Sequence, residues 1–78
     1  MHNLKKYLKN LDKDTLKKLL KISDLDELEY WILYYNYVEK RMVINTCMKL
    51  NISRAYYFIL KNKALIKVHY KIKELQKV

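Results

Sequence analysis

The stretch MVINTCMKLNISRAYYFILKNK, residues 42–63, decides the fold. Apolar side chains recur at helical spacing over residues 42–50, which predicts a short helix. Asn51 follows, and asparagine is the residue other than glycine that most readily adopts the left-handed conformation that turns a chain out of a helix. Ser53 is a favourable N-cap, so a second helix is expected from residue 54 to at least residue 63.

These two helices and their turn fit a helix-turn-helix. The small side chain of Cys47 permits close approach of the second helix, and the apolar Ile52 is expected to bury the turn. Ser53 caps the second helix and leaves its first residues free to enter a DNA major groove. Two short helices joined by an Asn turn also occur without any DNA-binding role, so a purely structural interpretation stays open.

The composition of the whole chain supports helices. The 78 residues include no Gly, no Pro and a single Cys, so tight hairpin turns are hard to build and no internal disulfide is possible. At 51% apolar and 32% charged residues, the chain is unlike a disordered one. We therefore expect an all-α fold, a small helical domain of four to five helices that contains the helix-turn-helix.

Outside the central motif, the pattern predicts further helices. Residues 3–22 fit one helix interrupted near Asp12, or two short ones, and residues 24–39 fit a helix that starts with a Ser23–Asp26 pair resembling a capping box. Residues 64–73 fit either a helix or a strand, with the helix favoured. The single domain, 1–78, is then divided into an N-terminal helical segment (1–22), a helix-turn-helix core (24–68) and a C-terminal helical extension (69–78). Whether residues 1–23 pack on the core is left open.

The charge is high and unevenly placed. The formal net charge is +9, with an excess of acids over residues 24–39 and ten basic residues against one acid over residues 40–78. A basic end of this kind suits a polyanion such as DNA. The alternative is that 15 Lys against two Arg reflect only a composition bias, because Arg is the better residue for recognising phosphates and guanines.

A family resemblance is carried by five short matches: Tyr37-Val38-Glu39-Lys40, Leu50-Asn51-Ile52-Ser53-Arg54, Tyr57-Phe58, Leu60, and Ala64-Leu65-Ile66-Lys67-Val68. The resemblance extends over residues 25–68, and the Ser53-to-Ala64 spacing is the one typical of the family. The segment resembles region four of bacterial sigma factors, and more closely the small phage transcription regulators derived from it, the ArpU-like activators. This resemblance implies a DNA-binding transcription regulator of phage or mobile-element origin, acting in the cytoplasm of a bacterial host.

Two sets of candidate site residues follow. The DNA-binding set consists of Lys40, Arg41, Ser53, Arg54, Tyr56, Phe58, Lys61 and Lys63, with Lys67 and Lys71 as further candidates for phosphate contacts. The protein-interface set consists of Ala55, Phe58, Ile59, Leu65, Val68, Ile72 and Leu75. The second set arises because the positions that the family uses to contact bases are apolar here except for Arg54, and an exposed apolar patch more often binds protein.

The expected function is therefore DNA binding by a helix-turn-helix regulator, with double-stranded DNA as partner and a homodimer built on the 65–75 stripe. The alternative is a protein-interaction module on the same scaffold that inhibits or redirects RNA polymerase or another regulatory protein. No pattern in the sequence indicates an enzyme, a cofactor, a metal site or a membrane-spanning segment, and we expect none of these. His2 and His69 lack metal-ligand spacing, and a phosphate-binding loop without glycine is not available.

Overall fold

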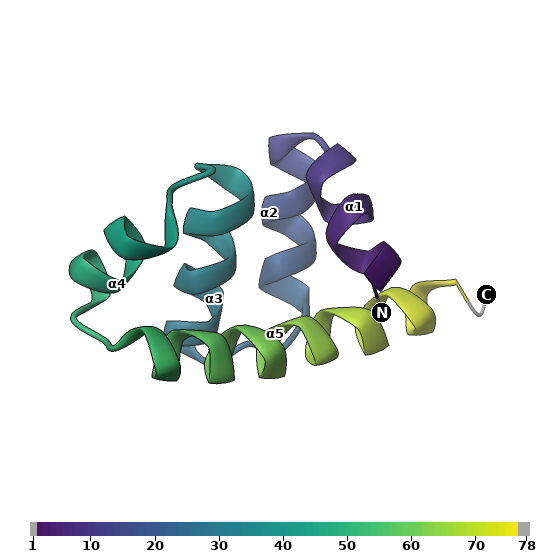
Figure 1. Cartoon of the computed structure of the whole chain (residues 1–78). Coiled ribbons are helices and arrows are strands. Elements are labelled where there is room, and N and C mark those ends of the chain that lie inside the picture. The colour runs from purple at the N-terminus through teal and green to yellow at the C-terminus, as the bar shows by residue number, and fades with distance from the viewer. Residues whose placement is uncertain (1, 77–78) are drawn as a thin grey trace.

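The computed structural model describes residues 2–76, which form five α-helices and one π-helical segment (Figure 1). No strand occurs in this range, so the all-α prediction is confirmed. The elements in chain order are α1 (His2–Asn10), α2 (Lys13–Ile22), α3 (Glu27–Leu33), the π-helical η1 (Tyr34–Val38), α4 (Val43–Leu50) and α5 (Arg54–Leu75).

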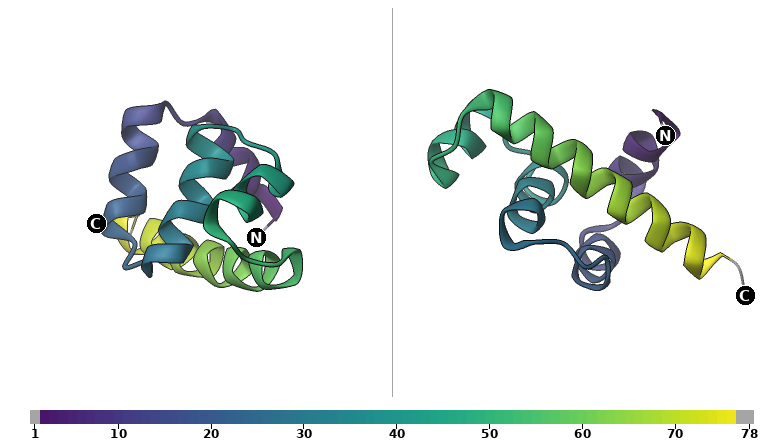
Figure 2. Two further views of the ribbon diagram at one scale, coloured as in Figure 1. Left: turned by 90° about the vertical axis from the view of Figure 1, so that its left-hand side faces the viewer. Right: turned by 90° about the horizontal axis from the view of Figure 1, so that it is seen from below.

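The long helix α5 forms the base of the molecule. In Figure 1 it runs along the bottom, with α1, α2 and α3 above it and α4 at the end where α5 begins, and Figure 2 shows from below that α5 crosses the whole length of the domain. The molecule is accordingly elongated, with extents of 40 × 22 × 21 Å. Residues 1, 77 and 78, which belong to the expected terminal segments, lie outside the described residues.

The N-terminal segment consists of two helices rather than one. The Asp12 carboxylate accepts a hydrogen bond of 3.2 Å from the backbone N–H of Thr15, which caps α2. Hydrogen bonding with the Thr15 side chain first, and then with its backbone N–H, lowers the pKa of Asp12. Both helices bury their leucines: Leu4 and Leu8 from α1, and Leu16, Leu19 and Leu20 from α2. Residues 4–22 therefore pack on the core, which settles a question that the sequence left open.

The predicted start of the third helix is wrong by about one turn. Ser23 closes α2 instead, because its buried hydroxyl donates a 2.6 Å hydrogen bond to the Leu19 carbonyl. Asp24 then takes a left-handed conformation at φ 55°, and α3 begins after Asp26. The Glu29 carboxylate accepts a 2.9 Å hydrogen bond from the Asp26 backbone N–H. The capping box is therefore formed by Asp26 and Glu29 rather than by the predicted pair Ser23 and Asp26.

The end of the third helix widens into the π-helical segment η1. The backbone N–H of Glu39 donates to the Tyr34 carbonyl at 3.1 Å, and that of Arg41 donates to the Tyr35 carbonyl at 2.8 Å. Lys40 lies between them in a left-handed conformation at φ 55°, which turns the chain toward α4. The predicted 24–39 helix is thus two elements, and the π-helical turn is a local geometry that hydrophobic periodicity does not reveal.

The turn between α4 and α5 has the predicted chemistry. Asn51 is left-handed at φ 57° and ψ 49°, and the Ser53 hydroxyl accepts a 3.1 Å hydrogen bond from the Tyr56 backbone N–H. The Ile52 backbone N–H donates to the Cys47 carbonyl at 3.0 Å, and the Cys47 side chain is buried below the turn. Residues 51–53 therefore fix the direction in which α5 leaves α4.

The tail is helical, as favoured from the sequence, but it is not a separate extension. Residues 69–75 are the last turns of α5, which runs for 22 residues without a break. Its inner side packs against both parts of the core. Ala64, Leu65 and Val68 contact the leucines of α1 and α2, and Tyr57 and Leu60 pack with Ile32 and Cys47.

This packing corrects two of the predicted interface residues. Leu65 is 3% exposed and Val68 is fully buried, so neither is available to a partner. The periodicity from Leu65 to Leu75 was that of a helix with an apolar side, and the partner of that side is the N-terminal pair of helices rather than a second chain. Ile72 is half-buried against the same core, and only Leu75 of this stripe is mostly exposed.

We expect the Lys40→Gly substitution to raise the free energy of unfolding by about 1 kcal/mol. Glycine adopts the left-handed conformation without the Cβ clash that costs other residues roughly 1–2 kcal/mol. Lys40→Ala is the matched control, because it removes the charge and keeps the clash. Urea denaturation measures both, and an equal gain in Lys40→Ala would show that charge rather than backbone conformation limits stability here.

Candidate nucleic-acid interface

The first turns of α5 present three of the eight predicted DNA-binding residues, Arg54, Tyr56 and Phe58, to the surface. Arg54 and Ala55 are exposed, and Tyr56, Phe58 and Ile59 are 46%, 47% and 53% exposed. These side chains lie on the outer side of a helix whose inner side is fixed by the core. The predicted residues of this helix start are therefore brought together on one surface.

Ser53 has a structural role in this surface. Its hydroxyl accepts the Tyr56 N–H, so the oxygen is occupied by the helix cap. Ser53 would therefore influence DNA binding by setting the orientation of α5 rather than by contacting DNA. Lys63, two turns further along, is exposed.

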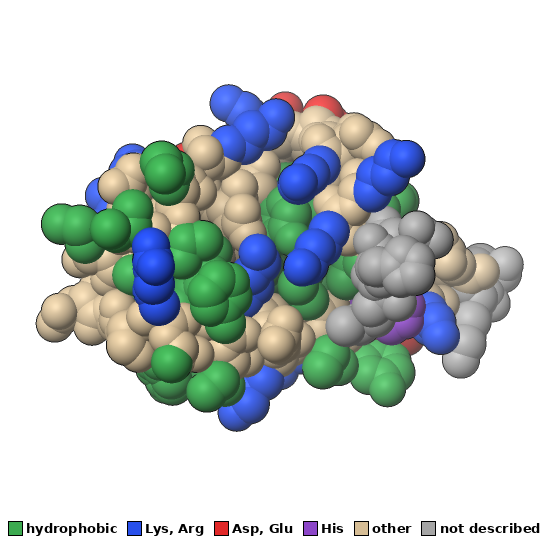
Figure 3. All heavy atoms as spheres, in the orientation of Figure 1, with side chains coloured by type: hydrophobic (Ala, Val, Ile, Leu, Met, Phe, Trp, Pro, Cys, Tyr) green, Lys and Arg blue, Asp and Glu red, His purple; other side chains and the backbone are tan. Residues whose placement is uncertain are grey.

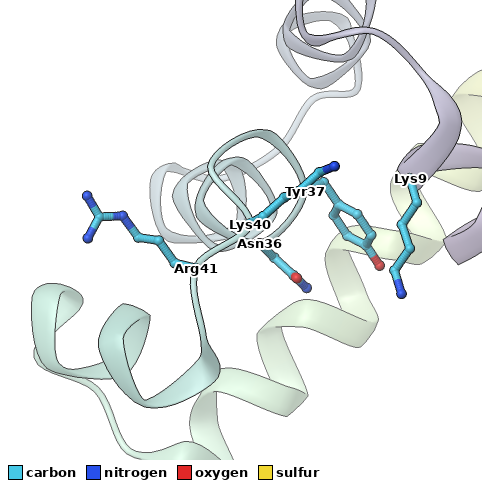
Figure 4. Close-up of a pocket in the computed structure, with 5 residues that line it drawn as sticks. All are labelled: Lys9, Asn36, Tyr37, Lys40 and Arg41. Atoms are coloured by element: carbon cyan, nitrogen blue, oxygen red, sulfur yellow. The ribbon is translucent and has the colours of Figure 1, made fainter.

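The predicted DNA-binding residues Lys40 and Arg41 lie in different electrostatic environments. The Arg41 Nε lies 2.7 Å from a Glu39 carboxylate oxygen, and its guanidinium carbon lies 5.3 Å from the centre of the Tyr35 ring. Figure 4 shows the Arg41 side chain pointing away from Lys9 and Tyr37, whereas Lys40 extends over the segment that carries Tyr37. The charge of Arg41 is thus partly neutralised and that of Lys40 is not.

A groove lies between α1 and the end of η1. It has a volume of about 270 Å³ and is lined by Lys9, Asn36, Tyr37, Lys40 and Arg41 (Figure 4). Lys9 and Tyr37 both line it, and Figure 4 shows the Lys9 ammonium and the Tyr37 hydroxyl directed toward the same side of the close-up. Burial, which is the larger cause, and the neighbouring Tyr57 raise the pKa of Tyr37 to about 12, so this hydroxyl keeps its proton at neutral pH and can donate a hydrogen bond.

Lys61 of α5 lies beside this groove, next to Tyr37. Its ammonium lies 5.7 Å from the centre of the Tyr37 ring and 5.9 Å from that of Tyr57. Partial burial first, and then the charges of Lys5 and Lys9, lower the pKa of Lys61. Figure 3 shows the face concerned, on which Lys and Arg atoms stand out while Asp and Glu atoms are visible mainly at the edges.

The opposite edge of α5 is neutralised. The Lys67 ammonium lies 2.6 Å from a carboxylate oxygen of Glu29, which is 1% exposed, and 3.9 Å from Asp26. The hydrogen bond to Glu29 is the main reason that the pKa of Lys67 is raised. Lys71 pairs with Glu74 at 3.3 Å. These two further candidates for phosphate contacts are therefore corrected, because each already has an acidic partner.

Sequence reasoning missed the groove. Lys9, Asn36 and Tyr37 come from elements far apart in the sequence, and no local spacing connects them with Lys61. The one available signal was the pair Lys5 and Lys9, four residues apart and therefore on one side of a predicted helix. Glu29 was counted in the sequence only within the excess of acids over residues 24–39.

Comparison with models of known protein families, with curated proteins and with solved structures finds no match for this chain. The resemblance to sigma-factor region four therefore stays a prediction. Within residues 2–76 no helix is long and apolar enough to cross a membrane. Among the side chains described, those of residues 4–76, no three from His, Cys, Asp or Glu gather in a way that could hold a metal ion.

We expect the stability of the fold to fall as the pH rises from 10.0 to about 12, because Tyr37 loses its proton first in the unfolded chain. Its contribution to stability is fully present below the ordinary pKa of 10.0 and is lost through this window. Urea denaturation across the window should show a shallower decline for Tyr37→Phe than for the unaltered protein. Tyr56→Phe, at an exposed tyrosine, is the control. Identical declines for all three proteins would contradict the assignment.

Proposed function

We propose that this protein is a small helix-turn-helix DNA-binding regulator of transcription, of phage or mobile-element origin. The observation that carries the proposal is the α4–turn–α5 geometry. Asn51 and Ser53 set the turn, and the first turns of α5 are exposed, as a helix that enters a major groove requires. The resemblance of residues 25–68 to the sigma-derived phage regulators supports the same function.

The distribution of charge is consistent with a duplex lying along one edge of α5. Arg54 and Lys61 are seven residues apart, so they lie on the same edge of the helix about 10 Å apart along its axis. The other edge carries Lys67, whose charge is balanced by Glu29. A DNA backbone is therefore attracted to the edge that begins with Arg54.

The exposed side chains limit the sequence specificity that we propose. Arg54 is the one guanidinium at the start of α5 and can bond a guanine in bidentate fashion. Ala55, Phe58 and Ile59 can contact thymine methyl groups but form no hydrogen bonds with base edges. We accordingly propose a protein that binds duplex DNA strongly through phosphates and discriminates weakly among sequences.

We expect binding to random duplex DNA to weaken steeply as the salt concentration rises, because bound phosphates release counterions. Arg54→Ala should weaken this binding by about fivefold or more and make the salt dependence shallower by about one phosphate contact. Fluorescence anisotropy at two salt concentrations measures both effects. Lys21→Ala, which removes an exposed charge from α2, is the control. Binding without salt dependence, or equal effects of the two substitutions, would overturn the proposal.

A second candidate function is favoured by the outer side of α5. Ile59, Ile66 and Tyr70 are 53%, 43% and 64% exposed and follow one another at helical spacing, so α5 is apolar on its outer as well as its inner side. Helices that are apolar all round are usually buried. The corresponding function is a protein-interaction module that binds RNA polymerase or another regulatory protein through this stripe.

Substitutions in this stripe separate the two functions. If a protein partner covers it, Ile59→Glu and Ile66→Glu should each abolish capture of that partner from a bacterial lysate. Ile66 lies after the first turns of α5, so Ile66→Glu should weaken binding to random duplex DNA only through its added negative charge. Asn62→Glu adds the same charge and is the control. The affinities of these two variants for DNA should agree within about twofold. Retained capture by Ile59→Glu would count against the second function.

A further inference from the structure

Several lysines in and beside the groove between α1 and η1 form no ion pair with an acid of the described residues. Among residues 2–76, the ion pairs of Lys and Arg with carboxylates involve Arg41, Lys67 and Lys71, and none involves Lys5, Lys9, Lys40 or Lys61. Lys61 is held partly buried among these charges, and its pKa is lowered by burial and by Lys5 and Lys9. Such mutual repulsion is relieved when an anion enters the groove.

Neutral donors complement these charges. The Tyr37 hydroxyl retains its proton, and the Asn36 side chain lines the same groove. Figure 4 shows the Asn36 amide, the Tyr37 hydroxyl and the Lys9 ammonium all directed toward the lower side of the close-up. An oxyanion at this place could accept hydrogen bonds from two neutral groups as well as from ammonium groups. This combination is typical of the way in which proteins position a DNA phosphate.

The supporting elements hold the groups in place. Leu4 and Leu8 of α1 are buried, which fixes the backbone of α1 at Lys5 and Lys9, and Lys9 lines the groove. Tyr37 is 5% exposed, and its ring lies below the Lys61 ammonium. The left-handed Lys40 places its side chain at the opposite rim. The groove is therefore formed by α1 and by the end of η1 with the turn that follows it, and Lys61 of α5 lies beside it over the Tyr37 ring.

We propose that this groove binds one phosphodiester of the DNA backbone, between Lys9 of α1 and Lys61 of α5, with the Tyr37 hydroxyl as a neutral donor. The inference deepens the proposed DNA binding and rests on it for the source of the phosphate. Because Lys61 lies two helical turns after Arg54 on the same edge of α5, one duplex can reach both. The function of α1 is then to clamp the backbone beside the helix that enters the major groove.

The test compares two double substitutions with equal loss of charge. Lys9→Gln/Lys61→Gln alters the groove, and Lys18→Gln/Lys21→Gln alters exposed positions of α2. With random duplex DNA, we expect the groove variant to bind about tenfold more weakly and its salt dependence to be shallower by about one phosphate contact. The α2 variant should bind within about twofold of the unaltered protein. The groove variant should melt no lower than the unaltered protein, because it loses a repulsion.

The outcomes distinguish this inference from the proposed function. If Arg54→Ala weakens binding and the groove variant behaves like the α2 variant, the DNA-binding function stands and the groove is not a phosphate site. If the groove variant weakens binding and Arg54→Ala does not, the groove is supported and entry of α5 into the major groove is wrong. Equal weakening by both double substitutions would show general attraction by charge and would overturn the groove.

A second measurement needs no substitution. Pyrophosphate, as a small phosphate probe, should shift the amide NMR signals of Asn36, Tyr37, Lys40 and Lys61 together, with one dissociation constant. Competition by random duplex DNA should reverse these shifts. Shifts spread evenly over all lysines, or none in the groove at millimolar pyrophosphate, would overturn the proposal even if a groove variant failed to fold.

Discussion

The contact between Glu29 and Lys67 determines how the rest of the molecule is arranged. One carboxylate oxygen of the buried Glu29 accepts both the Asp26 backbone N–H, which starts α3, and the Lys67 ammonium from the middle of α5. A buried carboxylate without these partners would be costly, so the two helices are held in one relative position. The same contact neutralises one edge of α5 and leaves the edge with Arg54 and Lys61 positive. The asymmetry of charge is thus a consequence of the packing of α3 on α5.

The absence of glycine imposes the second constraint. Three connections require a left-handed residue, and they use Asp24, Lys40 and Asn51. Asparagine is well suited to this conformation, and the turn at Asn51 was accordingly predictable from local chemistry. Lysine is poorly suited to it, and nothing in the local sequence marks Lys40 as a turn. The strain at Lys40 lies next to the π-helical turn of η1, where the chain leaves the core to form the α4–turn–α5 unit.

The sequence predicted what depends on neighbours along the chain and missed what depends on distant contacts. The helical content, the break at Asp12, the Asn51 turn and the Ser53 cap all follow from groups within four residues of one another. The burial of Leu65 and Val68 was misassigned because periodicity identifies an apolar side without identifying its partner, which is supplied by α1 and α2. Lys9 and Tyr37 line the groove and Lys61 lies beside it, and no local pattern reports that these three separated segments converge. The exposure of Phe58 and Ile59 was anticipated, because the family resemblance places them at positions that contact bases.

The buried Cys47 thiol can be used to detect local opening between α4 and α5. This is the only cysteine of the chain, and it is 6% exposed beneath the Asn51–Ser53 turn, with its sulfur 3.9 Å from the Ser53 carbonyl oxygen. A thiol in this position reacts with a labelling reagent only when α4 separates from α5. The labelling rate therefore measures the free energy of that local opening, and comparison with the free energy of complete unfolding separates movement of the α4–turn–α5 unit from loss of the whole fold.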